Sequence, residues 1–139
     1  MSHIGRIALI ALCALLLASC ASNPNHQFAA LTNAWKTRSG QLAYRSAKTS
    51  LIGEVLVRSS REGDLEVTFT KGPGLTLITI RQDAQFASAE GPLARGRWAG
   101  PTASAPERLR GWFALREKIL AGGSSAQLSS GGETFNLRF

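Results

Sequence analysis

The sequence has few residues that supply thiol or imidazole chemistry. Its 139 residues include two cysteines and two histidines, and the last of these four in the chain is His26. Residues 27–139 therefore contain no thiol for a disulfide and no imidazole for general base catalysis or metal binding. These absences exclude a serine–histidine–aspartate triad and a histidine- or cysteine-based metal site from that part of the chain.

Acidic residues are also scarce, with 9 Asp and Glu against 16 Lys and Arg and a net charge of +7. The carboxylates follow no catalytic motif. Glu54 and Glu66 could lie close together on adjacent strands, as an acid–base pair requires. Surface charges partnered by arginines are the alternative interpretation. We expect no enzymatic activity, no catalytic residue and no cofactor, and the positive charge favours anionic partners.

The one long apolar run, Ile7–Leu17, follows Arg6 near the N-terminus. It is too short to cross a bilayer, which takes about 20 residues, but it has the length of a signal-peptide core. It leads into Leu17-Ala18-Ser19-Cys20, which resembles the bacterial lipobox. In such a motif the cysteine becomes a diacylglyceryl cysteine, and its new amino group then gains an acyl chain such as palmitate. An ordinary signal peptide with a chance cysteine is the alternative.

These features predict the organisation and location of the chain. We expect a lipoprotein signal peptide over residues 1–19, a lipidated Cys20 and tether over residues 20–27, and a single domain over residues 28–139. Ala21 stands where an aspartate would resemble an inner-membrane retention signal, which favours a periplasm-facing position on the outer membrane. Several acyl chains on Cys20 would hold the protein firmly in that membrane. Nucleic acid is not an expected partner there, and the sequence has no basic–aromatic stacking motif.

The rest of the sequence predicts helices and short antiparallel strands. Phe28, Leu31 and Trp35 recur at helical spacing, which predicts an N-terminal helix over about residues 24–37. Pro106 and the Gly122-Gly123 pair bound a second predicted helix with an apolar face. Residues 91–101 are expected to form a loop with at most one short strand. Alternating apolar and polar residues, separated by turns, predict strands over residues 40–47, 51–59, 65–70, 75–81, 84–90 and 133–139.

We therefore predict an α+β fold in which an antiparallel curved sheet has one apolar face. Such a face must be covered. If the helices cover it fully, the interior is an ordinary core. If they cover it in part, a groove of lipid size remains. The candidate lining residues in that second case are Leu42, Tyr44, Val55, Val57, Val67, Phe69 and Trp112.

Three segments together with the lipobox resemble the LolA/LolB family of lipoprotein-localisation proteins. They are Gly40–Arg45 (GQLAYR), Asp64–Gly74 (DLEVTFTKGPG) and Ala105–Phe113 (APERLRGWF). The resemblance, which is strongest to LolB, implies an incomplete β-barrel with an N-terminal helix and a covering C-terminal helix. It also implies a concavity that binds the acyl chains of lipoproteins on their way to the outer membrane.

The family's exposed loop leucine has two candidate positions here. Pro73-Gly74-Leu75 follows the matching strand but reverses the order of the family's Pro-Leu-Gly, whereas Gly91-Pro92-Leu93 keeps the Pro-Leu order and comes two strands later. The chain is also shorter than mature LolB proteins. We expect the domain to bind lipid or lipoprotein acyl chains, with anionic envelope lipids as further partners. The alternative is a structural or interaction module that is displayed on the envelope.

Overall fold

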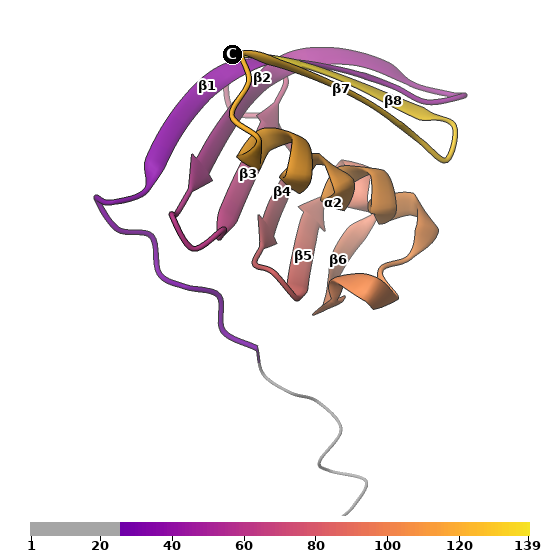
Figure 1. The fold of residues 1–139 in the computed structure, drawn as a ribbon. Helices are drawn as coiled ribbons and strands as arrows, with labels where there is room; N and C mark the ends of the chain where they lie inside the picture. Colours follow the sequence, from indigo (N-terminus) through magenta and orange to yellow (C-terminus); the bar gives the residue numbers. More distant parts are fainter. Residues whose placement is uncertain (1–25) are drawn as a thin grey trace, which may run out of the picture.

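The computed structural model describes residues 26–139, in which eight strands form one antiparallel sheet in the order β6-β5-β4-β3-β2-β1-β8-β7. The sheet curves around a single α-helix and stays open between its edge strands β6 and β7 (Figure 1). The predicted α+β class, the curved antiparallel sheet and the covering C-terminal helix are thereby confirmed. The elements are β1 (Lys36–Arg45), β2 (Ser50–Ser59), β3 (Leu65–Thr70), β4 (Thr76–Gln82), β5 (Phe86–Gly91), η2 (Pro92–Ala94), β6 (Gly96–Pro101), η3 (Thr102–Ser104), α2 (Glu107–Leu120), β7 (Ser125–Ser130) and β8 (Glu133–Arg138).

The strands follow the alternation of apolar and polar residues in the sequence. In β3, Leu65, Val67 and Phe69 are buried on the concave side of the sheet, whereas the residues between them face the other way and are only partly buried. Successive side chains of a strand point to opposite faces, so this pattern places the apolar set on one side. The same rule holds along β1 to β5, and the concave face therefore carries the core.

The C-terminal strands complete the sheet beside β1 and not beside β6. β8 pairs with β1, so that Leu42 lies opposite Leu137 and Tyr44 opposite Phe135. β7 then pairs with β8 and forms the outer edge. No strand was expected over residues 125–130, because Leu128 is the one large apolar side chain in that stretch.

The helix α2 lies across the concave face (Figure 1). Pro106 occupies its N-cap position, Glu107 lies in the first turn, and the helix ends just before Gly122, whose φ is +85°. A carboxylate in the first turn suits the helix dipole, and a glycine with positive φ suits the helix end. The residues that α2 buries are Leu109, Gly111, Trp112, Phe113, Leu115 and Ile119. Within residues 26–139 no helix is both long enough and apolar enough to span a bilayer.

The N-terminal helix expected over residues 24–37 is not formed in the part that the structure describes. Residues 26–35 contain no helix, and β1 already begins at Lys36; residues 24 and 25 lie outside the described part. The helical spacing of Phe28, Leu31 and Trp35 was misleading because α2 already covers the apolar concave face. Leu31 accordingly remains 39% exposed.

The N-terminal segment instead packs against the end of the β4–β5 hairpin. His26, which was expected to belong to a free tether, stacks on Phe86 with ring centroids 3.9 Å apart, and its Nε2 lies 2.5 Å from Asp83 Oδ2. Arg81 donates a hydrogen bond of 3.0 Å to the carbonyl oxygen of Ala29. Burial tends to raise the pKa of Asp83, but hydrogen bonds from two backbone amides and from His26 outweigh it and leave that pKa below its usual range.

Candidate binding site

The seven residues proposed to line a groove all lie in the core between α2 and the sheet, six on strands and Trp112 on α2. Their exposed fractions run from 0% to 8%, so they contact one another and the helix instead of an open channel. The structure therefore brings the predicted residues together, but their side chains fill the space between α2 and the sheet. They are Leu42, Tyr44, Val55, Val57, Val67, Phe69 and Trp112.

Trp112 is the side chain that fills the centre of this interior. Its ring centroid lies 4.9 Å from that of Tyr44, 6.0 Å from that of Phe69 and 4.9 Å from that of Phe135. The indole is 1% exposed. Gly111 allows the helix to come this close, because a Cβ at that position would lie 2.8 Å from a ring carbon of Phe135.

A cavity of about 530 Å³ opens at one end of the concave interior. It lies between the end of β1, the η2 turn, the start of α2 and the β7–β8 hairpin. Its volume falls within the range of small-molecule sites, about 300–1,000 Å³. The lining residues are Tyr44, Ser46, Leu93, Arg95, Pro106, Glu107, Arg108, Gly131 and Glu133.

Tyr44 connects this cavity to the core. Its ring packs against Trp112 and Phe135, whereas its hydroxyl donates a hydrogen bond to Oε2 of Glu133 at the cavity wall. Burial, followed by the hydrogen bond and the negative charge of Glu133, raises the pKa of Tyr44 to about 12, although Ser46 and the charge of Arg95 act in the opposite direction. The hydroxyl is therefore protonated and acts as a donor at neutral pH.

Arg95 enters the cavity from a strained backbone. Its φ of 54° and ψ of 46° place it in the left-handed region, and it is the one non-glycine residue with positive φ among residues 26–139. Within the same range neither Arg95 nor Arg108 has a carboxylate oxygen within 4.0 Å. Arg108 Nε donates instead to the carbonyl oxygen of Ala94 at 3.4 Å.

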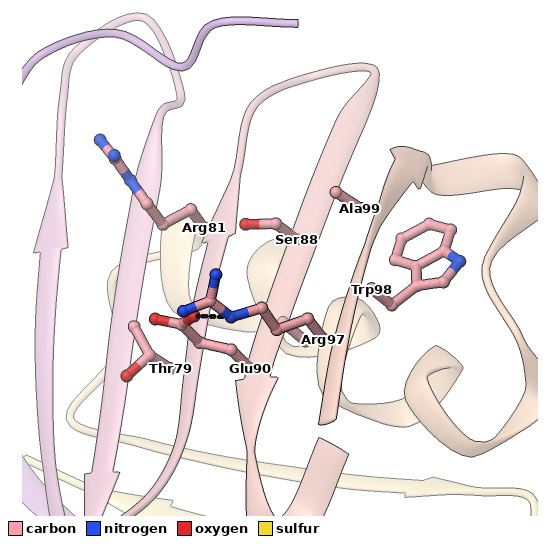
Figure 2. A pocket seen from close by; sticks show the side chains of 8 residues that line it. Thr79, Arg81, Ser88, Glu90, Arg97, Trp98 and Ala99 are labelled. Atoms are coloured by element: carbon pink, nitrogen blue, oxygen red, sulfur yellow. Dashed lines mark ion pairs between the residues drawn. The ribbon is translucent and has the colours of Figure 1, made fainter. Parts of the chain in front are cut away.

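A second, smaller hollow of about 280 Å³ lies over β4, β5 and β6 and carries charges that already have partners. Figure 2 shows Arg97 and Glu90 directed toward each other, and Arg97 Nε lies 3.1 Å from Glu90 Oε2. Both side chains are more than half exposed, so this pair contributes little to stability. Arg81, on the same wall, extends away from the pair.

The structure does not place Glu54 and Glu66, the two carboxylates considered as an acid–base pair, next to each other. Glu66 lies between Arg58 and Arg81, at 3.8 and 3.7 Å from their guanidinium nitrogens. Glu54 is exposed and pairs in register with Thr70, four residues along β3 from Glu66. Cross-strand neighbours of opposite charge of this kind are an ordinary source of sheet stability.

The two candidate loop leucines differ in environment. Leu75 follows the Gly72-Pro73-Gly74 turn between β3 and β4 and is 49% exposed. Leu93 lies in η2, packs against the core and lines the cavity. Cys20 lies outside the described residues.

Four charged residues of the cavity were not singled out in the sequence: Arg95, Glu107, Arg108 and Glu133. They come from the η2–β6 junction, the start of α2 and β8, segments that only the folded sheet places side by side. The one local signal is the pair Gly91 and Gly96, which marks a tight turn around Arg95. Comparisons of the sequence with models of known protein families and with curated proteins gave no match.

Proposed function

We propose that this chain is a lipoprotein of the bacterial outer membrane, anchored through Cys20, whose half-barrel domain resembles LolB and binds the acyl chains of lipids or lipoproteins. In this role it would aid lipoprotein localisation from the periplasmic side of the membrane. The supporting observation is the open, curved sheet, whose apolar face is covered by α2 and ends at a cavity. No covalent chemistry is part of the proposal.

Binding requires α2 to move away from the sheet, because the interior is filled in the described arrangement. Few polar contacts oppose this movement. Gln82 Nε2 donates to the carbonyl oxygen of Phe113 at 3.2 Å, and Arg116 donates to the carbonyl oxygen of Gly63 at 2.9 and 3.1 Å. Arg108 Nε also donates to the carbonyl oxygen of Ala94 at 3.4 Å. The remaining contacts are largely apolar, and an acyl chain can replace them with contacts of the same kind.

The hydrophobic effect supplies enough free energy for such an exchange. Burying a chain of roughly 14 methylenes contributes up to about 11 kcal/mol before the entropy of association is subtracted. The cost of exposing the buried face of α2 must also be subtracted, so the affinity depends on how much of that face the acyl chain covers.

The first test is native mass spectrometry of residues 21–139 mixed with a triacylated lipopeptide. The control is the same peptide without acyl chains. We expect a one-to-one complex with the lipopeptide alone. A domain that is folded by circular dichroism and binds neither peptide would contradict the proposed function.

A second measurement follows the movement of the helix. In the variant Trp35→Phe/Trp98→Phe, Trp112 is the one remaining tryptophan, so its emission reports on the space between α2 and the sheet. We expect a lipopeptide with brominated acyl chains to quench this emission. In the control Trp98→Phe/Trp112→Phe, Trp35 reports from the N-terminal segment and should be quenched far less. Equal quenching of both proteins would indicate non-specific adsorption.

The filled interior also favours a second candidate function, a structural or interaction module. Trp112 and its three aromatic neighbours leave the core packed, while Ile52 is 63% and Leu75 49% exposed on the outside. A module of this kind would hold a partner on its outer surface. This second function would be favoured if the parent protein bound a partner that Ile52→Ser did not bind, and if neither protein bound the lipopeptide.

A further inference from the structure

The cavity of about 530 Å³ at the end of the concave interior is lined by two positive and two negative side chains. Arg95 and Arg108 line it together with Glu107 and Glu133. Among residues 26–139, none of the ion pairs within 4.0 Å joins an arginine of the cavity to one of its carboxylates. Glu133 accepts from the Tyr44 hydroxyl and Arg108 Nε donates to the carbonyl oxygen of Ala94, but the four charges are not paired with one another and can meet a ligand that carries charges of both signs.

The backbone at Arg95 indicates that the position of this arginine is enforced. A residue with a Cβ is disfavoured in the left-handed region, and Arg95 occupies it directly before Gly96, whose own φ is +112°. Strained residues of this kind persist where the surrounding structure holds them, and they cluster at ligand sites. Here the strain accompanies a guanidinium that lines the cavity and whose charge reaches Tyr44.

The wall of the cavity changes from polar to apolar toward the core. Leu93 packs against the core, and the ring of Tyr44 contacts Trp112, while the hydroxyl of Tyr44 bonds to Glu133. A ligand with a charged head at the four side chains would therefore direct an apolar tail toward the space beneath α2. A charged end followed by an apolar part is the arrangement that a lipid with a compact headgroup requires.

We propose that the cavity binds the headgroup of a phosphoethanolamine lipid, an inference that rests on the proposed acyl-binding function. Arg95 and Arg108 donate charge-assisted hydrogen bonds to the phosphate, for which guanidinium groups are well suited. The primary ammonium donates to Glu107 and to Glu133. The carboxylate of Glu133 has lone pairs left to accept it in addition to the hydrogen bond from the Tyr44 hydroxyl. A purely anionic headgroup would leave the carboxylates unpaired, and a choline group has no N–H to donate.

Three lysophospholipids with the same acyl chain test this assignment. Isothermal titration of residues 21–139 with monomeric lyso-phosphatidylethanolamine, -phosphatidylcholine and -phosphatidylglycerol should give the tightest binding for the ethanolamine lipid. Glu107→Gln should reduce that preference over choline while binding is retained. Each tenfold change in Kd corresponds to about 1.4 kcal/mol, and a hydrogen bond to a charged group contributes about this much. We therefore expect Arg95→Gly to raise the Kd for the ethanolamine lipid roughly tenfold or more.

Arg95→Gly separates the loss of binding from the loss of folding. Glycine adopts the left-handed conformation freely, so this variant should melt at the same temperature as the parent or higher. Arg61→Gly, in the exposed turn between β2 and β3, removes the same charge away from the cavity and should bind normally.

The outcomes distinguish this inference from the proposed function. Equal affinity for all three lipids, with Arg95→Gly unchanged, overturns the headgroup site but leaves acyl binding in place. Tightest binding of the glycerol lipid overturns it in favour of an anion site. If neither the three lipids nor the triacylated lipopeptide binds, the proposed function itself fails.

Discussion

At the scale of single residues, Tyr44 has two roles that its position in β1 makes compatible. Its ring belongs to the aromatic cluster around Trp112, and its hydroxyl donates to Glu133 across the β1–β8 pair. Removing the hydroxyl would leave Glu133 without its tyrosine donor and leave the ring packing intact. The residue therefore links the stability of the core to the state of the cavity.

The raised pKa of Tyr44 predicts a loss of stability at high pH. The pKa of Tyr44 is about 12 in the folded protein, compared with about 10 for an unperturbed tyrosine. The folded state therefore holds the proton more tightly, and the stabilisation is complete below pH 10 and lost as the pH rises through about 12. We expect the free energy of unfolding to fall more steeply between pH 10 and 12 in the parent than in Tyr44→Phe, measured by urea titration. Parallel pH profiles would show that the tyrosine does not titrate as described.

Gly111 provides a second residue-scale prediction, in which packing opposes helix propensity. Alanine would favour the helix by about 1 kcal/mol, but its Cβ would lie 2.8 Å from the ring of Phe135. We expect Gly111→Ala to destabilise the protein by about 1–3 kcal/mol in urea unfolding. In a Phe135→Leu background the same substitution should cost much less or become favourable, as a double-mutant cycle can show. An equal cost in both backgrounds would place the strain elsewhere.

At the scale of elements, α2 is the one α-helix in residues 26–139, and its Trp112 packs against Phe69 of β3 and Phe135 of β8. Truncating a buried aromatic side chain removes its transfer free energy and leaves a cavity. We expect Trp112→Ala to reduce the free energy of unfolding by about 3–5 kcal/mol. Leu120→Ala, at a position that is 38% exposed on the same helix, should cost far less. A stability unchanged by Trp112→Ala would contradict the placement of the helix.

The elements also show how far the sequence predicts this fold. The alternation in Leu65–Thr70 predicts β3 directly, and Pro106 with Gly122 correctly bounds α2. β7 carried no such signal, because Ser125–Ser130 has little apolar periodicity and is ordered by pairing with β8. The expected N-terminal helix failed because its spacing rested on three residues, which had no free apolar surface to cover.

The candidate site could be predicted in part, again from the alternation of apolar and polar residues along the strands. Apolar residues that alternate along strands must share a face, and this placed all seven predicted lining residues in one core. Alternation does not reveal whether a helix fills the space above that face. The charged residues of the cavity come from separate segments, and no local rule predicts a left-handed Arg95.

At the scale of the whole molecule, the sheet depends on pairing between its first and last parts. β1 lies between β2 and β8, and β8 contributes the buried Phe135 and Leu137 opposite Tyr44 and Leu42. Removal of β8 would expose one edge of β1 and one side of the core. The C-terminal hairpin is therefore an integral part of the domain.

Truncation after Gly123 tests this dependence. Without β7 and β8 we expect the cooperative thermal transition, followed by circular dichroism, to disappear, and the protein to bind a dye specific for exposed apolar surface. Leu128→Ser, which leaves both strands in place, should keep a cooperative transition because Leu128 is only partly buried. A truncated chain that still melted cooperatively would show that β1 to α2 fold alone.

The pairing of β1 with β8 also sets the order of assembly. A chain is synthesised from its N-terminus onward, so the β1–β6 meander can pair strand by strand before β8 has been made. One edge of β1 stays unpaired until β8 has been made, and Leu42 and Tyr44 meanwhile lack their cross-strand neighbours Leu137 and Phe135. Open edges of this kind recruit other chains. Before β8 has been made, this unpaired edge of β1 is therefore the part of the sheet that is open to pairing with another chain.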